Sequence, residues 1–183
     1  MKYDLQWLQQ RYTIYKNIEY LFFWGHTPKS ENRIDKSCFS QWYPTPFVAG
    51  NITYLTAEHW MMAKKALLFG DEVQLENILT SDSPAQAKKA GRAVKNFDAA
   101  VWQQNAYRFV VEGNRLKFSQ HPALRQYLID TKDVIIVEAS PFDPIWGIGT
   151  KDHQTDPFKW RGTNLLGFAL MEVRASLKEN DEK

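Results

Sequence analysis

The sequence has a single cysteine, Cys38, and only four histidines. One cysteine excludes a disulfide within the chain and a zinc site built from several thiolates. The histidines are scattered, and no pair has i, i+4 or HExxH-type spacing, so we expect no metal. This cysteine usage makes the cytoplasm the expected compartment, and we interpret Cys38 as a buried small hydrophobe.

Long hydrophobic runs and a strong charge of either sign are also missing. Nowhere do eighteen apolar residues follow one another, and no basic head precedes an apolar run at the N-terminus, so we expect neither a membrane span nor a signal peptide. A net charge of +2 is too small for bulk electrostatic capture of nucleic acid or membrane. With 183 residues, 44% of them hydrophobic, the chain has the size and composition of one globular domain.

Aromatic residues, in contrast, are abundant: they make up 14% of the chain and include seven tryptophans. Such a content indicates either a large aromatic core or stacking platforms for a planar ligand, because tryptophan offers a flat face and an N–H donor. The position of each residue has to decide between the two.

The spacing of apolar residues predicts an α+β fold, a helix-rich body around a small sheet. Residues 18–25 and 134–140 have the composition of strands, and 47–55 that of a hairpin turning at Gly50 and Asn51. Helices are predicted over 1–17, 56–71, 81–94, 101–120, 121–128 and 164–180, and polar residues with Pro28 make 26–37 a surface loop.

The segment 56–71, "TAEHWMMAKKALLFGD", raises a question about its first turn. Its apolar residues, Leu67 among them, recur at helical spacing along one face, if the stem of Lys64 lies along that face, with Thr56 as N-cap and Gly70 as stop. Glu58 stands beside this face, near the surface, where the helix dipole favours a carboxylate. From the residues alone, a charge that complements the dipole is the commoner explanation, and a carboxylate prepared for chemistry is the alternative.

The segment "SPAQAKKAGR" begins with the helix-start pair Ser83-Pro84 and carries three basic side chains. Lys88 and Arg92 are four residues apart and therefore share a face. This face either holds a phosphate group or, as is commoner for basic helix faces, is merely solvated.

The loop over 141–163 is long for a compact domain, and ordered loops of this length usually bind something. We expect order, because Phe142, Trp146, Phe158 and Trp160 would otherwise be left in water. Within "FDPIWGIG", Asp143 and Trp146 precede glycines, and Gly147 lets the backbone approach a ligand closely. Two interpretations stay open: a small-molecule site, or an Asp-Pro turn with Trp146 as its apolar plug.

Five motifs together make the chain resemble the NADAR superfamily, whose bacterial members include the YbiA-like proteins. They occur in the family's order over roughly residues 18–178: "YLTAEHWMMAKKALLFGD", "SPAQAKKAGR", a segment ending in "LKFSQHPALRQYLIDT", "DPIWGIG" and "RGTNLLGFALMEVR". The resemblance implies an α+β domain that hydrolyses N-glycosidic bonds between ribose and a base. The domain would span 18–178, after an extension at 1–17 and before a polar tail at 179–183.

The resemblance also implies site residues. Glu58 would stabilise the cationic sugar or activate water, with Asp143 as the partner carboxylate. Trp102 and Trp146 would sandwich the base, and Arg92 with Lys65 would hold the phosphate. Gly147 and Asn164 match the substrate-binding loop and the motif that closes it, and neither a metal nor a cofactor is required.

Two substrate classes are associated with the family. The first, which we prefer, is the phosphoribosylamino-pyrimidine intermediates of riboflavin biosynthesis; the second is ADP-ribose attached to guanine in nucleic acid. A non-catalytic reader of ADP-ribose or nucleotides is a further alternative, and no membrane partner is expected. The chain departs from the family by having Ser40-Gln41-Trp42 where many members have Ser-Asn-Phe, and by carrying the extension and the 26–37 loop.

Overall fold

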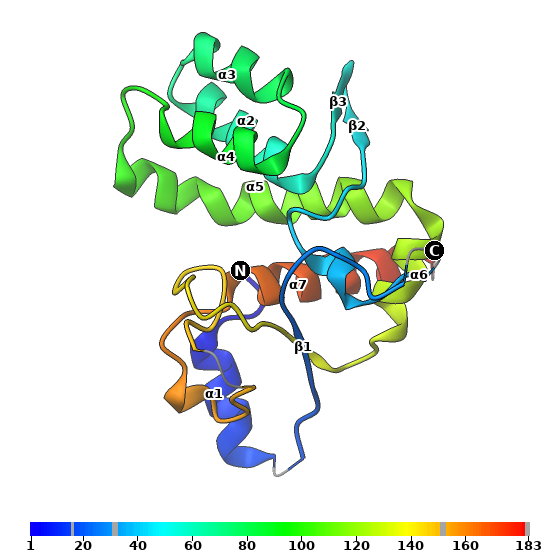
Figure 1. Ribbon diagram of the computed structural model, residues 1–183. Coiled ribbons are helices and arrows are strands. Elements are labelled where there is room, and N and C mark those ends of the chain that lie inside the picture. The colour runs from blue at the N-terminus through cyan, green and yellow to red at the C-terminus, as the bar shows by residue number, and fades with distance from the viewer. Residues whose placement is uncertain (16, 31–32, 151–152, 182–183) are drawn as a thin grey trace. The chain divides into compact units, whose positions relative to one another are not determined.

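The computed structural model describes residues 1–15, 17–30, 33–150 and 153–181, which group into two compact units (Figure 1). The first unit comprises Met1–Ser40 and Pro122–Lys183, and the second comprises Gln41–His121. Each unit contains one two-stranded sheet, and helices make up most of the rest. The predicted helix-rich α+β fold with little sheet is therefore confirmed.

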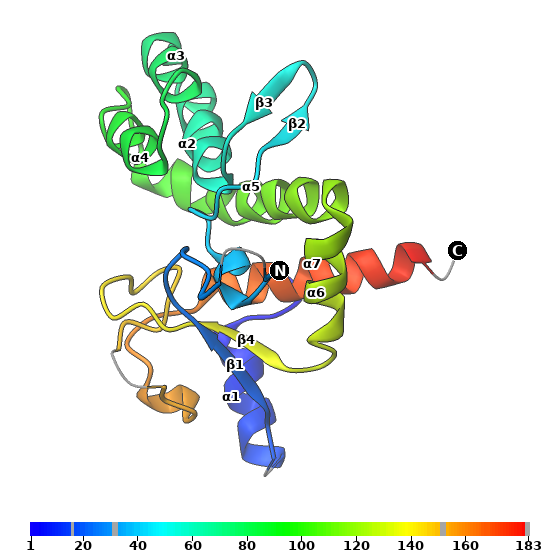
Figure 2. The same cartoon turned by 45° about the vertical axis from the view of Figure 1, so that its right-hand side comes forward.

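The first unit is built on a parallel pair of strands, β1 (Tyr20–Phe23) and β4 (Ile135–Glu138) (Figure 2). Tyr20 pairs with Ile135 and Phe23 with Glu138. The other elements of this unit are α1 (Leu5–Ile14), the 3-10 turns η1 (Lys36–Phe39) and η2 (Pro157–Lys159), α6 (Pro122–Asp130) and α7 (Leu165–Asp181).

Helix α7 packs directly on β4, and a glycine makes the close approach possible. A Cβ atom on Gly167 would lie 2.1 Å from the carbonyl oxygen of Ile136, closer than any real side chain could come. The face of α7 predicted to be buried is buried: Leu166, Leu170, Val173 and Leu177 are each at most 3% exposed. Together with the apolar strand β4 they form the core of this unit.

In the second unit, one helix packs on a long helix and on two shorter helices (Figure 1). Helix α2 (Ala57–Leu68) contacts α3 (Glu72–Leu79), α4 (Pro84–Arg92) and α5 (Ala99–Gln120). The antiparallel hairpin of β2 (Phe47–Ala49) and β3 (Ile52–Tyr54) precedes α2 and turns at Gly50, whose φ is +60°. The Gln120 side chain fastens the hairpin to α5 by exchanging two hydrogen bonds, 2.7 and 2.8 Å long, with the backbone of Val48.

Helices α2 and α5 pack closely where Trp60 lies against Gly113. A Cβ atom at Gly113 would come within 2.4 Å of the Trp60 ring, so glycine is required there. The indole N–H of Trp60 donates to the carbonyl oxygen of Phe109 at 2.8 Å. The longest helix therefore holds α2 through both packing and a buried hydrogen bond.

Several sequence predictions are confirmed in detail. Thr56 and Ser83 are the N-caps of α2 and α4, Pro84 stands at the start of α4, and Cys38 is fully buried. The strands and the other helices lie within a few residues of their predicted bounds. Helix α3 was not predicted, because it is short and its start depends on Asp71, whose carboxylate accepts the N–H groups of both Gln74 and Lys95.

Other expectations were wrong. Leu67, placed on the apolar face of α2, is 53% exposed, whereas its neighbour Ala66 is fully buried. Phe142 and Phe158 are 77% and 58% exposed, whereas Trp160 is buried as expected. The aromatic side chains of the 141–163 loop are therefore not all buried.

The predicted extension at 1–17 contains α1, and α7 continues into the predicted tail as far as Asp181. Residues 31–32 of the 26–37 loop and residues 182–183 of the tail lie outside the described residues. The domain boundaries stay predictions. Within the described stretches, no helix combines the length and the apolar character that crossing a membrane requires.

Candidate functional site

The eight predicted site residues are divided equally between the two units. Asp143, Trp146, Gly147 and Asn164 belong to the first unit, and the second contains Glu58, Lys65, Arg92 and Trp102. Each group of four has its own local architecture.

Glu58 is the second residue of α2, and its side chain is only 5% exposed. The expectation that it lies near the surface was therefore wrong: a carboxylate at this position is buried together with most of the first two turns of the helix. The backbone N–H of Glu58 donates to the carbonyl oxygen of Gln41 at 2.9 Å. A carboxylate is seldom buried without a specific reason, because removing its charge from water is costly.

The neighbouring His59 has a structural role. It is buried, and its Nδ1 and Nε2 lie 2.8 Å from Thr56 Oγ1 and 3.1 Å from the carbonyl oxygen of Ser81. Burial lowers the pKa of His59, while the bond to Ser81 acts in the opposite direction. A neutral ring that donates from Nε2 and accepts at Nδ1 satisfies both contacts.

Lys65 lies seven residues after Glu58, two helical turns and about 10 Å along the same face of α2. Its Nζ donates to the carbonyl oxygen of Gly91 at 2.8 Å. The same atom lies 4.1 Å from the ring centroid of Phe97 and 5.8 Å from that of Trp102. Three elements therefore meet at one ammonium group.

The end of α4 reaches Lys65 because Gly91 has no side chain. A Cβ atom there would lie 2.1 Å from the Met62 sulfur, so only glycine lets α4 approach α2 so closely. Burial, and secondly the charge of the adjacent exposed Arg92, lower the pKa of Lys65. The positive charges of Lys65 and Arg92 repel each other, and an anionic ligand bound between them would offset this repulsion.

Trp102 lies in the first turn of α5 and is half-buried. Its ring packs at 6.2 Å and 35° against Phe109 and is close enough to Lys65 for a cation–π contact. The structure therefore places Lys65, Arg92, Trp102 and also Phe97 near one another; the roles of the three predicted residues toward a substrate stay predictions. This cation–aromatic cluster can hold an anion next to a planar group.

In the first unit, Asp143 shapes a turn. Its Oδ1 accepts the backbone N–H groups of Ile145 at 2.9 Å and Trp146 at 2.8 Å. This is the Asp-Pro turn that the sequence allowed as one of two interpretations. Both bonds use a single carboxylate oxygen of a half-buried residue.

The turn provides the cap of α7. The carbonyl oxygens of Ile145, Trp146 and Gly147 accept the N–H groups of Leu165, Leu166 and Asn164, respectively, at 3.0–3.2 Å. These donors would otherwise have no partner within the helix. Since the loop takes them, the start of α7 is not an anion site, and Trp146 is held in place through its backbone.

Asn164 joins this loop to the sheet. It is fully buried with φ +54°, its Oδ1 accepts the N–H of Glu138 at 2.9 Å, and its Nδ2 donates to the carbonyl oxygen of Ile136 at 3.0 Å. Gly147 is also buried, and a Cβ atom there would lie 3.0 Å from the carbonyl oxygens of Glu138 and Asp143. These contacts explain both residues as supports of the loop; their contact with substrate stays a prediction.

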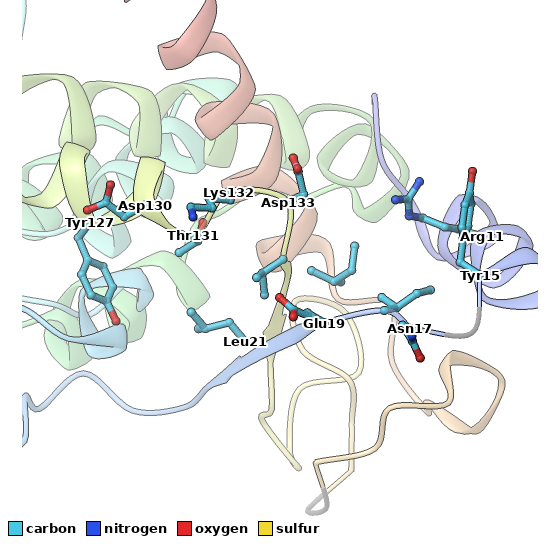
Figure 3. Close-up of a pocket in the computed structure, with 13 residues that line it drawn as sticks. Arg11, Tyr15, Asn17, Glu19, Leu21, Tyr127, Asp130, Thr131, Lys132 and Asp133 are labelled. Atoms are coloured by element: carbon cyan, nitrogen blue, oxygen red, sulfur yellow. The ribbon is translucent and has the colours of Figure 1, made fainter.

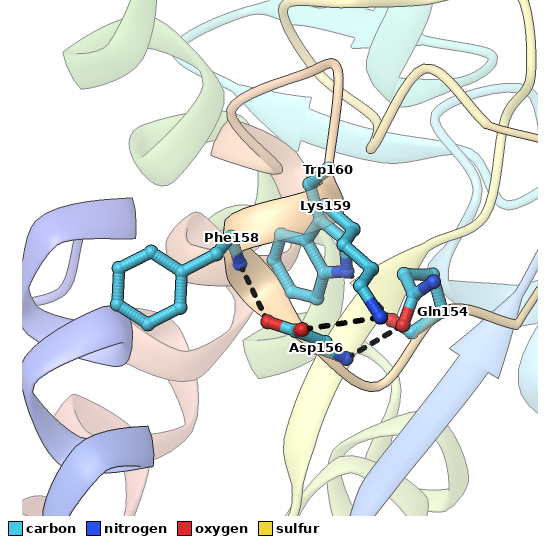
Figure 4. A network of polar contacts seen from close by, with 5 residues as sticks. All are labelled: Gln154, Asp156, Phe158, Lys159 and Trp160. Carbon is cyan, nitrogen blue, oxygen red and sulfur yellow. Dashed lines mark hydrogen bonds and ion pairs between the residues drawn. The ribbon is translucent and has the colours of Figure 1, made fainter.

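The second half of the long loop has its own polar network (Figure 4). The indole N–H of Trp160 donates to the carbonyl oxygen of Gln154 at 2.6 Å, and Asp156 accepts the N–H of Phe158 at 3.0 Å. Helix α1 supports this part, since the Gln9 side chain donates to the carbonyl oxygen of Pro157. Hydrogen bonds as well as burial therefore hold residues 154–160 of the loop in place, whereas residues 151–152 lie outside the described residues.

A pocket of about 750 Å³ lies elsewhere in the first unit, between the end of α1, β1 and the turn after α6 (Figure 3). None of the eight predicted site residues lines it, and its polar lining mixes both charges: Arg11, Glu19, Asp130, Lys132 and Asp133. No group of three or more His, Cys, Asp or Glu side chains in the described stretches is placed to hold a metal ion.

Sequence reasoning missed Phe97 and a pair of amides, Gln41 and Asn114. Phe97 follows α4 with no helical pattern around it, so nothing local marks it. Asn114 did leave a signal: it stands between the buried residues Gly113 and Lys117 on the inner face of α5, where a polar side chain needs a partner.

Comparison with known proteins gives a consistent result. A family model described as the NADAR domain matches residues 22–178. N-glycosidase R617 of Acanthamoeba polyphaga mimivirus is 43% identical over 164 residues, which cover 85% of this chain and 95% of the relative. N-glycosidase YbiA of Escherichia coli (strain K12) is 32% identical over 148 residues, which cover 81% and 84%, respectively.

The fold is also shared. The NMR structure of the Escherichia coli protein YbiA superposes with a TM-score of 0.70 at 25% sequence identity. The superposition covers 91% of this chain and 90% of the other.

The lowered pKa of Lys65 can be tested. In an NMR titration of its side chain, Lys65 should lose its proton below the ordinary pKa of 10.5, because burial and the Arg92 charge disfavour the ammonium form. Arg92→Gln should move this titration to higher pH. Lys89→Gln, which removes an exposed cation from the same helix, is the control and should leave it in place. An Arg92→Gln titration identical to that of the wild type would contradict the electrostatic contact.

Proposed function

This chain belongs to the NADAR family and is an N-glycosidase, and we propose that it hydrolyses the bond between ribose and a base in a phosphorylated ribosyl substrate. The preferred substrates are the phosphoribosylamino-pyrimidine intermediates of riboflavin biosynthesis. They combine the three features for which the second unit has matching groups: a planar base, a ribose and a terminal phosphate.

One observation carries the proposal: a single face of α2 presents a buried carboxylate at its start and a cation two turns later. A ribose 5-phosphate carries the complementary charges, because its reacting carbon becomes cationic during the reaction while the phosphate at its far end is anionic. Glu58 therefore suits the sugar, and Lys65 with Arg92 suits the phosphate. Binding of the remote phosphate can supply free energy for orienting the ribose.

The chemistry follows from the charge that develops. As the bond from C1 to the base nitrogen breaks, its electron pair leaves with the base, and the ribose becomes an oxocarbenium-like cation. A fixed negative charge stabilises this cation without having to reorganise during the reaction. Water then adds to C1, and its surplus proton passes by way of a carboxylate to the departing nitrogen, so the products are ribose phosphate and the free base.

We assign the carboxylate roles accordingly. Glu58 stabilises the cation or takes the proton of the attacking water, and Asp143 is proposed as the second carboxylate of the reaction. Only Oδ1 of Asp143 is engaged by the amides of its turn, which supports a further role for the other oxygen. Trp102 and Trp146 are proposed as platforms for the base.

The basic face of α4 supports a second candidate, the removal of ADP-ribose from guanine in nucleic acid. Arg92 of the cation–aromatic cluster lies on the short helix α4, which also carries Lys88 and Lys89, and the three cations together would suit a longer polyanion than one phosphate. The two candidates share the cleavage step and differ in what is attached to the ribose.

The experiment offers the purified protein both substrate classes and follows release of the base by chromatography. We expect release of the pyrimidine from the phosphoribosylated substrate, with the unphosphorylated nucleoside as a matched control that reacts more slowly. Release only from ADP-ribosylated nucleic acid would select the second candidate. Binding without any release would show a non-catalytic reader and contradict the proposal.

Trp102 provides a more local prediction. Trp102→Ala should weaken substrate binding by about 1–3 kcal/mol, which is the worth of one stacked base. Trp102→Phe, which keeps an aromatic face, should retain most of the affinity. Affinity is measured by titration calorimetry and folding by thermal unfolding. An affinity unchanged in Trp102→Ala, or a loss of binding explained entirely by unfolding, would remove the stacking role.

A further inference from the structure

We propose that Gln41 is a positioning residue that fixes the catalytic carboxylate of Glu58 by linking the start of α2 to the middle of α5. The inference deepens the proposed function and rests on the catalytic role of Glu58 given there. It assigns a task to the position at which the chain departs from the family by having glutamine in place of asparagine.

The first link is made by the backbone. The initial N–H groups of a helix have no partner within it. In α2, the hydroxyl oxygen of Thr56 accepts the N–H of His59, and the carbonyl oxygen of Gln41 accepts that of Glu58 at 2.9 Å. The peptide that carries the catalytic side chain is therefore held by a residue seventeen positions earlier in the chain.

The second link fixes Gln41 itself. Its Nε2 donates to Oδ1 of Asn114 at 3.1 Å. Asn114 is fully buried, and its Nδ2 donates to the carbonyl oxygen of Val110 at 2.9 Å, so the side that faces Gln41 must be the acceptor. A chain of three hydrogen bonds therefore runs from the backbone of α5 through two amides to the backbone of Glu58.

The neighbouring residue restrains the same segment from another direction. The ring centroid of Trp42 lies 5.7 Å from the Nζ of Lys88 on α4. Residues 41 and 42 are thus held by α5 and α4 while they give a carbonyl oxygen to α2. A catalytic group displaced by about 1 Å can lose about 10²-fold in rate, so a link of this kind affects turnover more than folding.

Lys65 lies two turns after Glu58 on α2, and Arg92 on α4 and Trp102 on α5 lie near it. These three residues, which are proposed to bind the phosphate and the base, form none of the three hydrogen bonds of the link. Loss of the link should therefore separate the two kinetic constants. The turnover rate of the enzyme–substrate complex, kcat, should fall, while the substrate concentration at half-saturation, KM, should stay near that of the wild type.

The test compares four variants with the wild type. Gln41→Met keeps the length of the side chain without its N–H, and Gln41→Asn keeps the amide but is one methylene too short. Both should lower kcat about tenfold or more with KM within about twofold. Gln103→Met, at an exposed position on α5, is the matched control with wild-type values. Adding Asn114→Leu to Gln41→Met should lower kcat no further, because both remove the same bond.

A second measurement does not depend on turnover. Hydrogen exchange at the backbone N–H of Glu58 should become about tenfold faster in Gln41→Met, while exchange at Ala66, in the last turn of α2, should not change. An unchanged kcat in both Gln41 variants, or unchanged exchange at Glu58, would overturn the inference. If the wild type releases no base at all, the proposed function fails, and with it the catalytic purpose of the link; the exchange result still decides whether the link exists.

Discussion

The burial of one carboxyl group, that of Glu58 at the start of α2, is the constraint on which the proposed site depends. Glu58 is almost inaccessible to water, so protein groups must provide the stabilising polar interactions that water would give to an exposed carboxyl group. The positive end of the helix dipole supplies part of this compensation. Because the N–H groups of Glu58 and His59 are already bonded to Gln41 and Thr56, the first turn is rigid before any ligand arrives.

The same principle organises the start of α7 in the other unit. There the carbonyl oxygens of Ile145, Trp146 and Gly147 take the first N–H groups of the helix, and Asp143 holds the turn that presents them. Asn164 then ties this assembly to the backbone of β4. Protein groups accept N–H groups at both helix starts, which is why we propose the side chains of Lys65 and Arg92, and not a helix terminus, for phosphate recognition.

Local signals in the sequence were sufficient for most elements. The caps Thr56 and Ser83, the turn at Gly50 and the apolar periodicity of α7 each act within a few residues, and each was confirmed. Lys65, Arg92 and Trp102, which the family resemblance singles out, lie near one another, and their roles stay predictions. Local patterns were less useful where partners are distant: the burial of Glu58 depends on segments far from it in sequence, and so does the bond from Gln41 to Asn114.

Asn164 shows why the role of a residue is harder to predict than its position. Its left-handed backbone and its two bonds to β4 depend on how α7 approaches the strand, which no local pattern encodes. Phe142 shows the opposite error, because hydrophobic character alone suggested burial for a side chain that is 77% exposed. Periodicity therefore predicts elements well, whereas roles within a loop depend on contacts between segments.

The most direct test of the account replaces Glu58 by glutamine, which has the same shape but no charge, and measures binding and single-turnover cleavage of the phosphoribosylated substrate separately. Since the N–H of residue 58 still bonds to Gln41, the helix start should persist and binding should change little. The account predicts that cleavage falls by about 10²-fold or more, the usual effect of removing one preorganised electrostatic group. Cleavage by Glu58→Gln at the wild-type rate would contradict it.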